Sequence, residues 1–463
     1  MPSIPDPRAA VAPDSGRARW LMLLALTGGF TLSQAWRTIA AIMAPALQRD
    51  FALSAQQLGL FAGIFHFAFG ALQLLMGVGI DLYGVRRTVL AAFPLTVAGA
   101  ALSALAHDFP LLLLGQALIG IGCAPAFLVC SVFIVQRFPP GQFASVSGTV
   151  LALGGVGMLI TGTPLAWVIE TSSWRGGFVA LGALSVLAWL AIWRVVREPG
   201  GGTVEPGAGV PGPGEAAHGV RRETLGDALR GFVALFAMPH TWGIVALSAV
   251  TYAAFVTLRG LWLGPMLIER YGMSLVQAGN VAIGVSLASM VALPLFGRFD
   301  PGPGTRRRRL VQFTLVCAAL FVLLALGAGA AADIALSTLY AVLTGFIVYQ
   351  YADVRAAYPA AVIGRALALF TMAMFLGVAL MQWLTGVAAS AAAARGVATY
   401  TAVMGAIAAM LVAGAAAFAW LPQPAGRDAN GREANGRDTD GRDAEGRDAE
   451  GQGADGRPDA TGR

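Results

Sequence analysis

The stretch Gly77-Val78-Gly79-Ile80-Asp81-Leu82-Tyr83-Gly84-Val85-Arg86-Arg87 lies between two long apolar segments of the chain. It sets a carboxylate at the end of one segment and two arginines at the start of the next. A carboxylate placed there can bond an arginine or the amino terminus of a helix, and so can latch two helices together. A second copy of the glycine and arginine spacing runs from Gly297 to Arg307. The stretch is therefore interpreted as a connection between membrane helices that the chain uses twice.

The composition around this stretch indicates a membrane protein. The chain is 57% apolar and 12% charged, with a mean hydropathy of +0.68, whereas a soluble domain is about a quarter charged. Its basic residues are all arginine and cluster between the apolar runs. This is the positive-inside pattern of membrane proteins, so the net charge of +6 does not indicate nucleic-acid binding.

An internal repeat relates the two halves of the chain. A shift of 220 positions superposes a series of helix-end residues, and the pairs are Pro45 and Pro265, Ser54 and Ser274, Gln57 and Gln277, Gly84 and Gly304, and Arg86 and Arg306. Three of these pairs are Gly, Pro or Arg at the helix junctions, where coincidence in an Ala/Leu-rich chain is least expected. A parallel repeat of this length is typical of transporters built from two similar halves.

The Gly77 to Arg87 stretch resembles the major facilitator signature G-x-x-x-D-[RK]-x-G-R-[RK]. The resemblance implies an all-α membrane protein with twelve transmembrane helices in two six-helix bundles. It also implies a conformational gate at Gly77, Asp81, Gly84, Arg86 and Arg87. Leu82 replaces the usual basic residue, and Gln116 stands where the family often has an arginine linked to proton coupling.

The pattern of apolar and polar segments predicts five regions. They are a cytoplasmic N-terminal tail (1–19), a six-helix bundle (20–198), a Gly/Pro-rich cytoplasmic linker (199–239), a second six-helix bundle (240–421) and a disordered cytoplasmic tail (422–463). The arginine-rich loops are expected on the cytoplasmic side. We therefore expect a multi-pass protein of a bacterial-type inner membrane, with both termini in the cytoplasm.

Two arginines stand inside apolar segments, Arg37 in the first span and Arg259 in the seventh. A charge at membrane depth costs about 2.5–3.5 kcal/mol on insertion scales and is a functional hypothesis by default. Two guanidinium groups opposed across a cavity suit a carboxylate or a phosphate. The pair also resembles that of glycerol phosphate antiporters and vesicular organic anion transporters, in which helices 1 and 7 each supply an arginine.

An alternative for this pair is anchoring, with both arginines snorkelling to the outer interface and Trp36 and Trp262 as interfacial belt residues. The two arginines are 222 positions apart instead of 220. Two residues turn a helix by about 200°. Strict symmetry would therefore require an irregular turn before Pro45 or Pro265.

Further polar residues at membrane depth complete the candidate site. Gln34, Tyr252 and Gln382 are expected to contact substrate beside the arginines, since buried polar groups need partners. His66 could titrate near neutral pH and couple transport to protons; a packing histidine is an equal alternative. Asp353, close to Arg355, is expected either in a cytoplasmic gate or as an interfacial charge.

These features predict a secondary active transporter that works by alternating access. Its expected substrate is a small solute, an organic anion. The alternative is a drug or metabolite efflux carrier of the same fold. An enzyme or a receptor is not indicated, because the sequence has neither a nucleotide-binding loop nor metal-ligand spacing. We expect no cofactor and no metal. The expected partners are a small-molecule substrate, a coupling proton and membrane lipid, with no nucleic acid, and the chain is expected to be a monomer.

Overall fold

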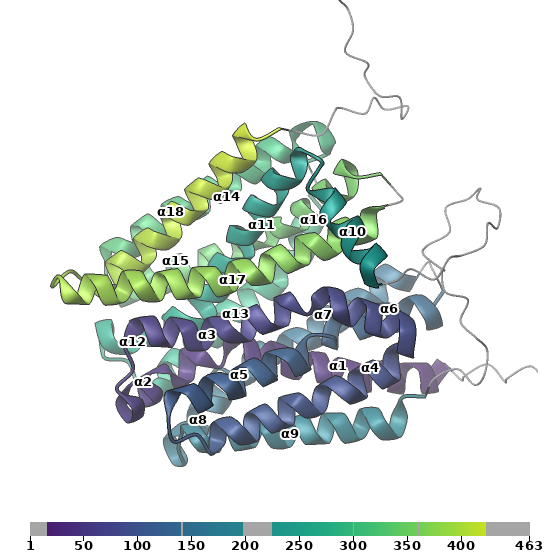
Figure 1. The fold of residues 1–463 in the computed structure, drawn as a ribbon. Coiled ribbons are helices and arrows are strands. Elements are labelled where there is room, and N and C mark those ends of the chain that lie inside the picture. The colour runs from purple at the N-terminus through teal and green to yellow at the C-terminus, as the bar shows by residue number, and fades with distance from the viewer. Residues whose placement is uncertain (1–15, 140–141, 198–224, 300, 360–361, 423–463) are drawn as a thin grey trace, which may run out of the picture. The chain divides into compact units, whose positions relative to one another are not determined.

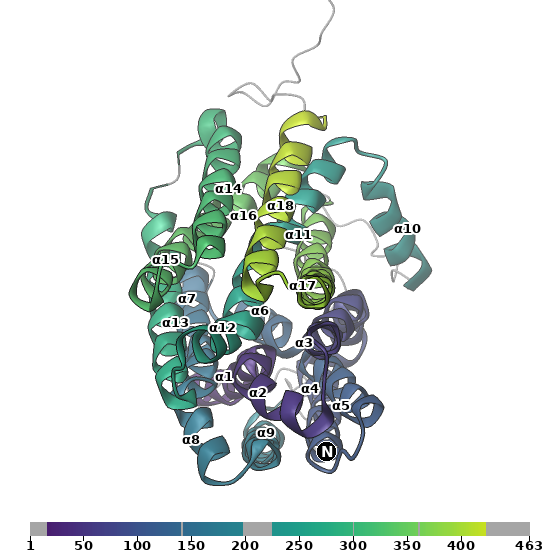
Figure 2. The same ribbon diagram turned by 90° about the vertical axis from the view of Figure 1, so that its left-hand side faces the viewer.

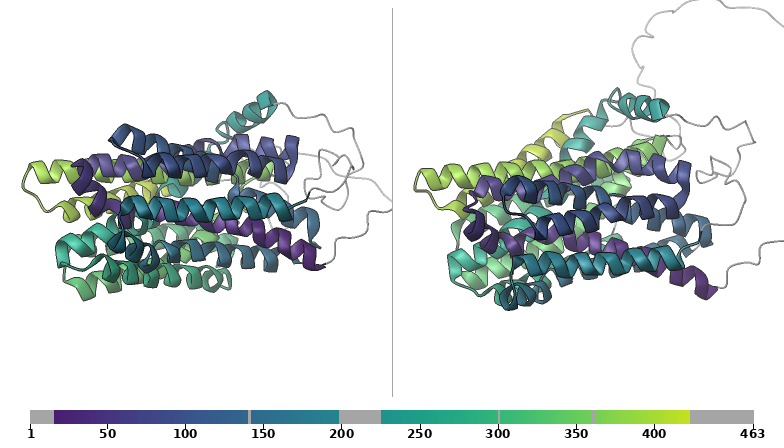
Figure 3. Two further views of the ribbon diagram at one scale, coloured as in Figure 1. Left: turned by 90° about the horizontal axis from the view of Figure 1, so that it is seen from below. Right: turned by 60° about the horizontal axis from the view of Figure 1, so that its bottom comes forward.

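A computed structural model describes residues 16–139, 142–197, 225–299, 301–359 and 362–422 of the chain. Within these ranges the regular structure is helical and contains no strand. Ten helices in this part are long and apolar enough to cross a membrane, and most run along one shared direction (Figure 3). The expected all-α membrane protein is confirmed. Most of the expected N-terminal tail, linker and C-terminal tail lies outside the described residues.

The N-terminal half, residues 16–197, folds into helices that several short interruptions divide (Figure 1). They are α1 Gly16–Thr38, α2 Ala40–Phe51, α3 Ala55–Ala71, α4 Gln73–Ala104, α5 Phe109–Cys123, α6 Ala126–Arg137, α7 Phe143–Ile160, α8 Thr163–Thr171 and α9 Trp174–Val195.

The C-terminal half, residues 225–422, begins with the short helix α10 Leu225–Leu235. The remaining elements are α11 His240–Thr257, the π-helix η2 Leu258–Trp262, α12 Leu263–Tyr271, α13 Leu275–Gly297, α14 Pro303–Leu326, α15 Ala330–Leu343, the 3₁₀ turn η3 Thr344–Phe346, α16 Ile347–Ala357, α17 Ile363–Ala394 and α18 Thr399–Trp420. Figure 2 shows α11, α14 and α18 grouped together, apart from α4, α5 and α9 of the N-terminal half.

The repeat seen in the sequence reappears in the way two helices begin. Ser54 caps α3 and Ser274 caps α13, each by accepting a hydrogen bond from a backbone N–H three residues on. In return Gln57 and Gln277 accept bonds from the backbone N–H of the two serines, both at 2.9 Å. These capping boxes satisfy N–H groups that the first helical turn leaves free. The same corner is thus built twice from residues 220 positions apart.

Gly84 bends the chain between two helical segments inside α4. Its φ of 83° lies in the region that side chains with a Cβ avoid, which explains the glycine in the sequence motif. In the second half the corresponding bend uses Gly302, with φ of 78°, and Gly304 is an ordinary residue of α14. The predicted match of Gly84 with Gly304 is therefore off by two positions.

Arg86 joins this bend to the end of α9. Its guanidinium donates to the backbone carbonyls of Val196 at 2.7 Å and Trp193 at 3.0 Å. A cation bonded to the last carbonyls of a helix also complements the helix dipole. The side chain of Asp81, the predicted partner in this motif, lies outside the described part of the chain, while Arg87 is exposed.

The first and seventh predicted spans are both irregular. Ile39 separates α1 from α2, and the π-helical turn η2 separates α11 from α12. The offset of 222 positions between Arg37 and Arg259 required one irregular turn before Pro45 or Pro265. The structure has an interruption in both places: Ile39 lies two residues after Arg37, and Arg259 lies within η2 itself.

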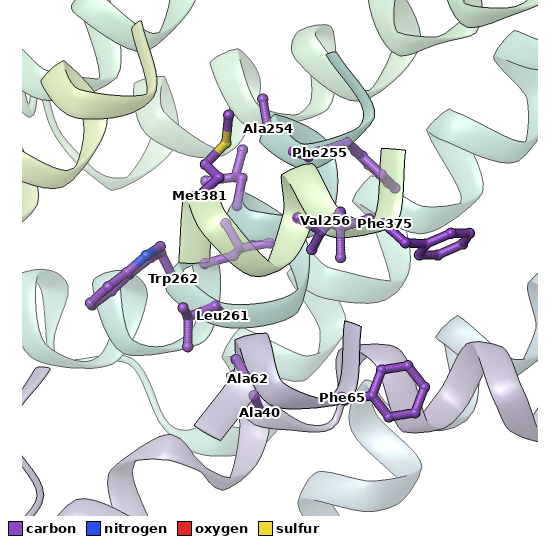
Figure 4. Close-up of a cluster of buried hydrophobic side chains, with 14 of the residues drawn as sticks. Ala40, Ala62, Phe65, Ala254, Phe255, Val256, Leu261, Trp262, Phe375 and Met381 are labelled. Carbon is purple, nitrogen blue, oxygen red and sulfur yellow. The ribbon is translucent and has the colours of Figure 1, made fainter. Parts of the chain in front are cut away.

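The two halves pack closely along α3 and α17, which lie side by side (Figure 1). A Cβ on Gly59 would overlap the backbone carbonyl oxygen of Gln382, and one on Gly63 would lie 2.9 Å from that of Ala379. Elsewhere a Cβ on Gly279 of α13 would lie 2.8 Å from the backbone nitrogen of Thr163 in α8. Buried apolar side chains from both halves form one cluster here (Figure 4). We call the region of these two contacts, α3 with α17 and α13 with α8, the closed end.

Candidate functional site

A cavity of about 2590 Å³ lies between the two halves. It reaches from Arg37 and Thr38, at the end of α1, to the end that we call the basic end, which carries Arg86, Arg87, Arg137, Arg197 and Arg365. The glycines of the closed end are not among its lining residues. The cavity therefore opens at the basic end and stops where the halves meet.

Arg37 is the cation at the inner limit of this cavity. It stands one residue from the end of α1 and is 7% exposed. Its Nη1 and Nη2 donate to the Tyr252 hydroxyl and the Ser33 Oγ, both at 3.4 Å, and its Nε has no hydrogen-bond partner among the described residues. Contacts of 3.4 Å are at the weak limit of hydrogen bonding. No carboxylate in the described part of the chain forms an ion pair with Arg37.

Two phenylalanines fix the plane of this guanidinium. Its central carbon lies 4.5 Å from the ring centre of Phe69 on α3 and 4.7 Å from that of Phe375 on α17. The two rings, one from each half, are themselves 4.3 Å apart. Cation–π contacts stabilise the charge through the faces of the rings. Arg37 itself is one of the residues that line the cavity.

Gln34 and Tyr252, two of the residues expected to contact substrate beside Arg37, also line the cavity. Gln34 precedes Arg37 by one turn of α1, and Tyr252 comes from α11 of the other half. Sequence reasoning missed Phe69 and Phe375. The spacing of apolar residues shows no signal that would separate these two rings from the many other phenylalanines of the core.

Arg259 has a different environment from Arg37. It is fully buried and is not among the residues that line the cavity. Its Nε donates to the Ala282 carbonyl at 3.0 Å and to the Ser286 Oγ at 2.8 Å, and its Nη2 donates to the Met158 carbonyl at 2.7 Å. The sequence suggested that the two arginines oppose one another across the cavity. In this conformation they do not. The residues that surround Arg259 in α13 and α7 hold it away from the cavity.

The anchoring alternative placed Trp36 and Trp262 at the membrane interface, and the structure contradicts it. Both indoles are buried, with exposures of 1% and 2%. Trp36 donates to the Ser185 Oγ at 3.2 Å and Trp262 to the Thr385 Oγ1 at 2.9 Å. Each ring packs inside its own half, so neither belongs to an interfacial belt.

His66 and Gln382 meet where α3 and α17 adjoin, outside the cavity. His66 is 1% exposed and its Nδ1 lies 3.1 Å from the Ala62 carbonyl. Gln382, a polar neighbour of His66, is fully buried. Neither His66 Nε2 nor the two polar atoms of the Gln382 amide has a partner with hydrogen-bonding geometry among the described residues. Unpaired buried polar atoms from two elements indicate a place where a proton or a water molecule would be favourable.

Asp353 pairs with Arg307 and not with the nearby Arg355. The Arg307 guanidinium donates from Nε and Nη2 to the two carboxylate oxygens, both at 3.0 Å. Arg355 is exposed to the surroundings. This bidentate bond joins α14 to α16 within the C-terminal half, and Arg307 also stacks 4.7 Å from the ring centre of Phe418.

Replacing Asp353 with asparagine is expected to lower the free energy of unfolding by about 1–3 kcal/mol, because the Arg307 cation loses its counter-charge in a mostly buried position. The melting temperature of the detergent-purified variant checks this. Arg355→Gln is the matched control, since an exposed charge contributes little. Equal melting temperatures for wild type, Asp353→Asn and Arg355→Gln would show that this ion pair does not stabilise the fold.

Known transporters share both sequence and fold with this chain. The hexuronate transporter of Bacillus subtilis (strain 168) is 31% identical over 163 residues, 35% of this chain and 38% of that protein. The D-galactonate transporter of Escherichia coli O6:H1 is 26% identical over 188 residues, 40% of this chain and 43% of that protein. The chain thus matches less than half the length of these two relatives. The crystal structure of a D-xylose–proton symporter has the same fold, with a TM-score of 0.68 at 16% identity over 88% of this chain and 98% of the other.

A second solved structure, a bacterial homolog of the human lysosomal transporter Spinster in an inward-facing conformation, superposes with a TM-score of 0.65. It is 19% identical and the match covers 88% of this chain and 95% of the other. Residues 25–352 match the Major Facilitator Superfamily, most of the length of the chain. The chain therefore belongs to the Major Facilitator Superfamily, a family of membrane transporters and not of enzymes.

Proposed function

We propose that this transporter is a secondary carrier of organic anions and that Arg37 binds the anionic group of its substrate. The observation that carries the proposal is a cavity-facing guanidinium that is 7% exposed and has no ionic partner among the described residues. A buried cation without a counter-charge is costly, and a bound anion would supply the missing charge. The planar fork of arginine also matches a carboxylate in geometry.

The names of the relatives favour the same substrate class. Two of them are transporters of hexuronate and of D-galactonate, both of which are sugar carboxylates. The described side chains that line the cavity include no aspartate or glutamate. A carrier of cationic drugs would gain from such a carboxylate, so the cavity favours an anion over the alternative of drug efflux.

We also propose the twelve-span arrangement expected from the sequence. Ten spans are the long apolar helices already described. The other two are α1 with α2, and α3 with the part of α4 before Gly84, each of which is interrupted by a short irregular turn. The two bundles would be residues 20–198 and 240–421, joined by the linker 199–239, within which α10 lies.

In this arrangement the basic end faces the cytoplasm, because arginine-rich loops stay on that side of the membrane. The cavity would then open inwards, and the contact of α3 with α17 would close the outer side. Transport would proceed by alternating access, in which the two bundles rock about a site near the middle of the membrane. Gly77, Gly84, Arg86 and Arg87 line this cavity. We propose that they form the cytoplasmic gate together with Asp81.

His66 is proposed as the coupling residue, since its Nε2 is buried without a hydrogen-bond partner beside the equally unpaired Gln382 amide. Uptake that depends on a pH gradient should become independent of it in His66→Gln, because glutamine cannot carry the proton. Proteoliposomes with and without an imposed gradient measure this. The exposed His107→Gln serves as the control. A gradient dependence in His66→Gln equal to that of wild type would exclude His66 from coupling.

A further inference from the structure

Arg37 and Arg259 bond in opposite directions between the two halves of the chain. Arg37 belongs to the N-terminal half and donates to Tyr252 of the C-terminal half at 3.4 Å. Arg259 belongs to the C-terminal half and donates to the carbonyl of Met158, in the N-terminal half, at 2.7 Å. The Arg259 bond is much the shorter. Both donors are charged guanidinium groups, and hydrogen bonds from a charged donor are roughly twice as strong as neutral ones.

The local structure positions both the donor and the acceptor of the bond between Arg259 and Met158. Met158 lies two residues before the end of α7, where the helix gives way to an irregular turn at Thr161 and Gly162. Its carbonyl therefore lies near the helix end, where it also accepts a bond from the Thr161 hydroxyl at 3.1 Å. On the other side, Ser286 and the Ala282 carbonyl hold the Arg259 Nε from α13 of the same half.

Arg259 therefore has two kinds of partner. The bonds to Ala282 and Ser286 stay within the C-terminal half and would survive any movement of one half against the other. The bond to Met158 would break if the halves separated here. The same seam holds the tight approach of Gly279 to Thr163 and a hydrogen bond from the Thr163 hydroxyl to Asn280 Oδ1.

We infer that Arg259 is a latch that keeps the closed end shut through its bond to the Met158 carbonyl. The inference rests on the alternating access proposed above, but it does not depend on the charge of the substrate. When the halves part at this end, the Nη2 group loses its acceptor, and the Nη1 group already has none among the described residues. Arg259 can then face the newly opened cavity as a second cation. Its contribution to an anion site is thus restricted to the state in which the closed end has opened.

The test measures the separation of the two halves at the closed end. Spin labels at Leu105→Cys and Leu326→Cys report it, because both side chains are well exposed, at 67% and 73%, and lie at the far ends of α4 and α14 from the basic end. The native cysteines 123, 130 and 317 are buried and would be changed to serine or alanine. Double electron–electron resonance in lipid nanodiscs then gives the ratio of long to short distances.

The variant Arg259→Gln separates the two kinds of bond. Glutamine can still reach Ser286, but its side chain is too short to reach Met158 as well. We expect the ratio of long to short distances to rise about tenfold over the labelled wild type, the effect of losing one hydrogen bond to a charged group. Ser286→Ala, which removes a partner within the same half, should leave the ratio close to wild type.

Gly279→Ala provides an independent opening of the same seam, because its Cβ would lie 2.8 Å from the Thr163 backbone nitrogen. An unchanged or lowered ratio in Arg259→Gln overturns the latch, whether or not Gly279→Ala opens the seam. A rise in Ser286→Ala equal to that in Arg259→Gln also overturns it, since the bond across the halves would then not be the cause. Alternating access itself fails if no variant and no substrate produces the long distance.

Discussion

Replacing Arg37 with methionine is expected to weaken the binding of an organic anion by about 30-fold or more. Removing one partner of a buried, hydrogen-bonded charge pair costs roughly 2 kcal/mol or more, which corresponds to this change in affinity. Methionine keeps much of the length of the side chain and can pack against Phe69 and Phe375, so the variant should still fold. Calorimetric titration of the purified protein with D-galactonate or a hexuronate measures the effect.

Two further variants show which property of Arg37 matters. Arg37→Lys keeps the charge but loses the planar fork and much of the stacking on the two rings, so we expect an intermediate affinity. Arg49→Met removes an exposed arginine twelve positions further along the chain, in the last turn of α2, and should bind like wild type. Full affinity in Arg37→Met would show that the anion binds elsewhere, and full affinity in Arg37→Lys would exclude recognition by the fork.

Replacing Gly59 with alanine is expected to reduce transport at least about tenfold while the protein remains folded. The added Cβ would overlap the Gln382 carbonyl oxygen on the other half, a backbone atom that no side-chain rotation can move. Overpacking of this kind costs about 1–3 kcal/mol, and here the cost falls on the conformation in which the closed end is shut. The carrier should therefore accumulate with that end open and fail to complete its cycle.

Uptake into proteoliposomes, normalised to folded protein by size-exclusion chromatography, checks the Gly59 prediction. Gly28→Ala is the matched control, because no described atom outside its own helix backbone lies within 4 Å of a Cβ at that position. Transport by Gly59→Ala at the rate of Gly28→Ala would mean that the two halves do not need this close approach. A loss of folded Gly59→Ala would instead assign the glycine to folding.

The sequence predicted the membrane fold because its signals are local. The Gly77 to Arg87 motif, the apolar segments and the 220-residue repeat each depend on residues that are close in the chain or on a constant offset. Ser54 and Ser274 show this well, since the same cap begins a helix in both halves. Gly84 is a further example, because its positive φ gives the motif glycine a physical reason.

The candidate site was harder to predict because it depends on how each helix is rotated. Arg37 and Arg259 both stand inside apolar segments of the sequence, yet one lines the cavity and the other is buried against α13 and α7. Ile39 and the π-helical turn η2 interrupt these two spans, and their positions leave no simple trace in the apolar spacing. Likewise Asp353 pairs with Arg307, which lies 46 positions away, and only the packing of α14 against α16 brings the two together.

The central claim is that this carrier recognises its substrate by negative charge, and counterflow with matched sugars tests it most directly. Proteoliposomes would be preloaded with unlabelled D-galacturonate and supplied outside with labelled D-galacturonate or with labelled D-galactose, its neutral counterpart. We predict that the labelled acid accumulates, that the neutral sugar does not, and that Arg37→Met abolishes the accumulation. Equal accumulation of the neutral sugar, or undiminished accumulation of the acid in Arg37→Met, would contradict the account.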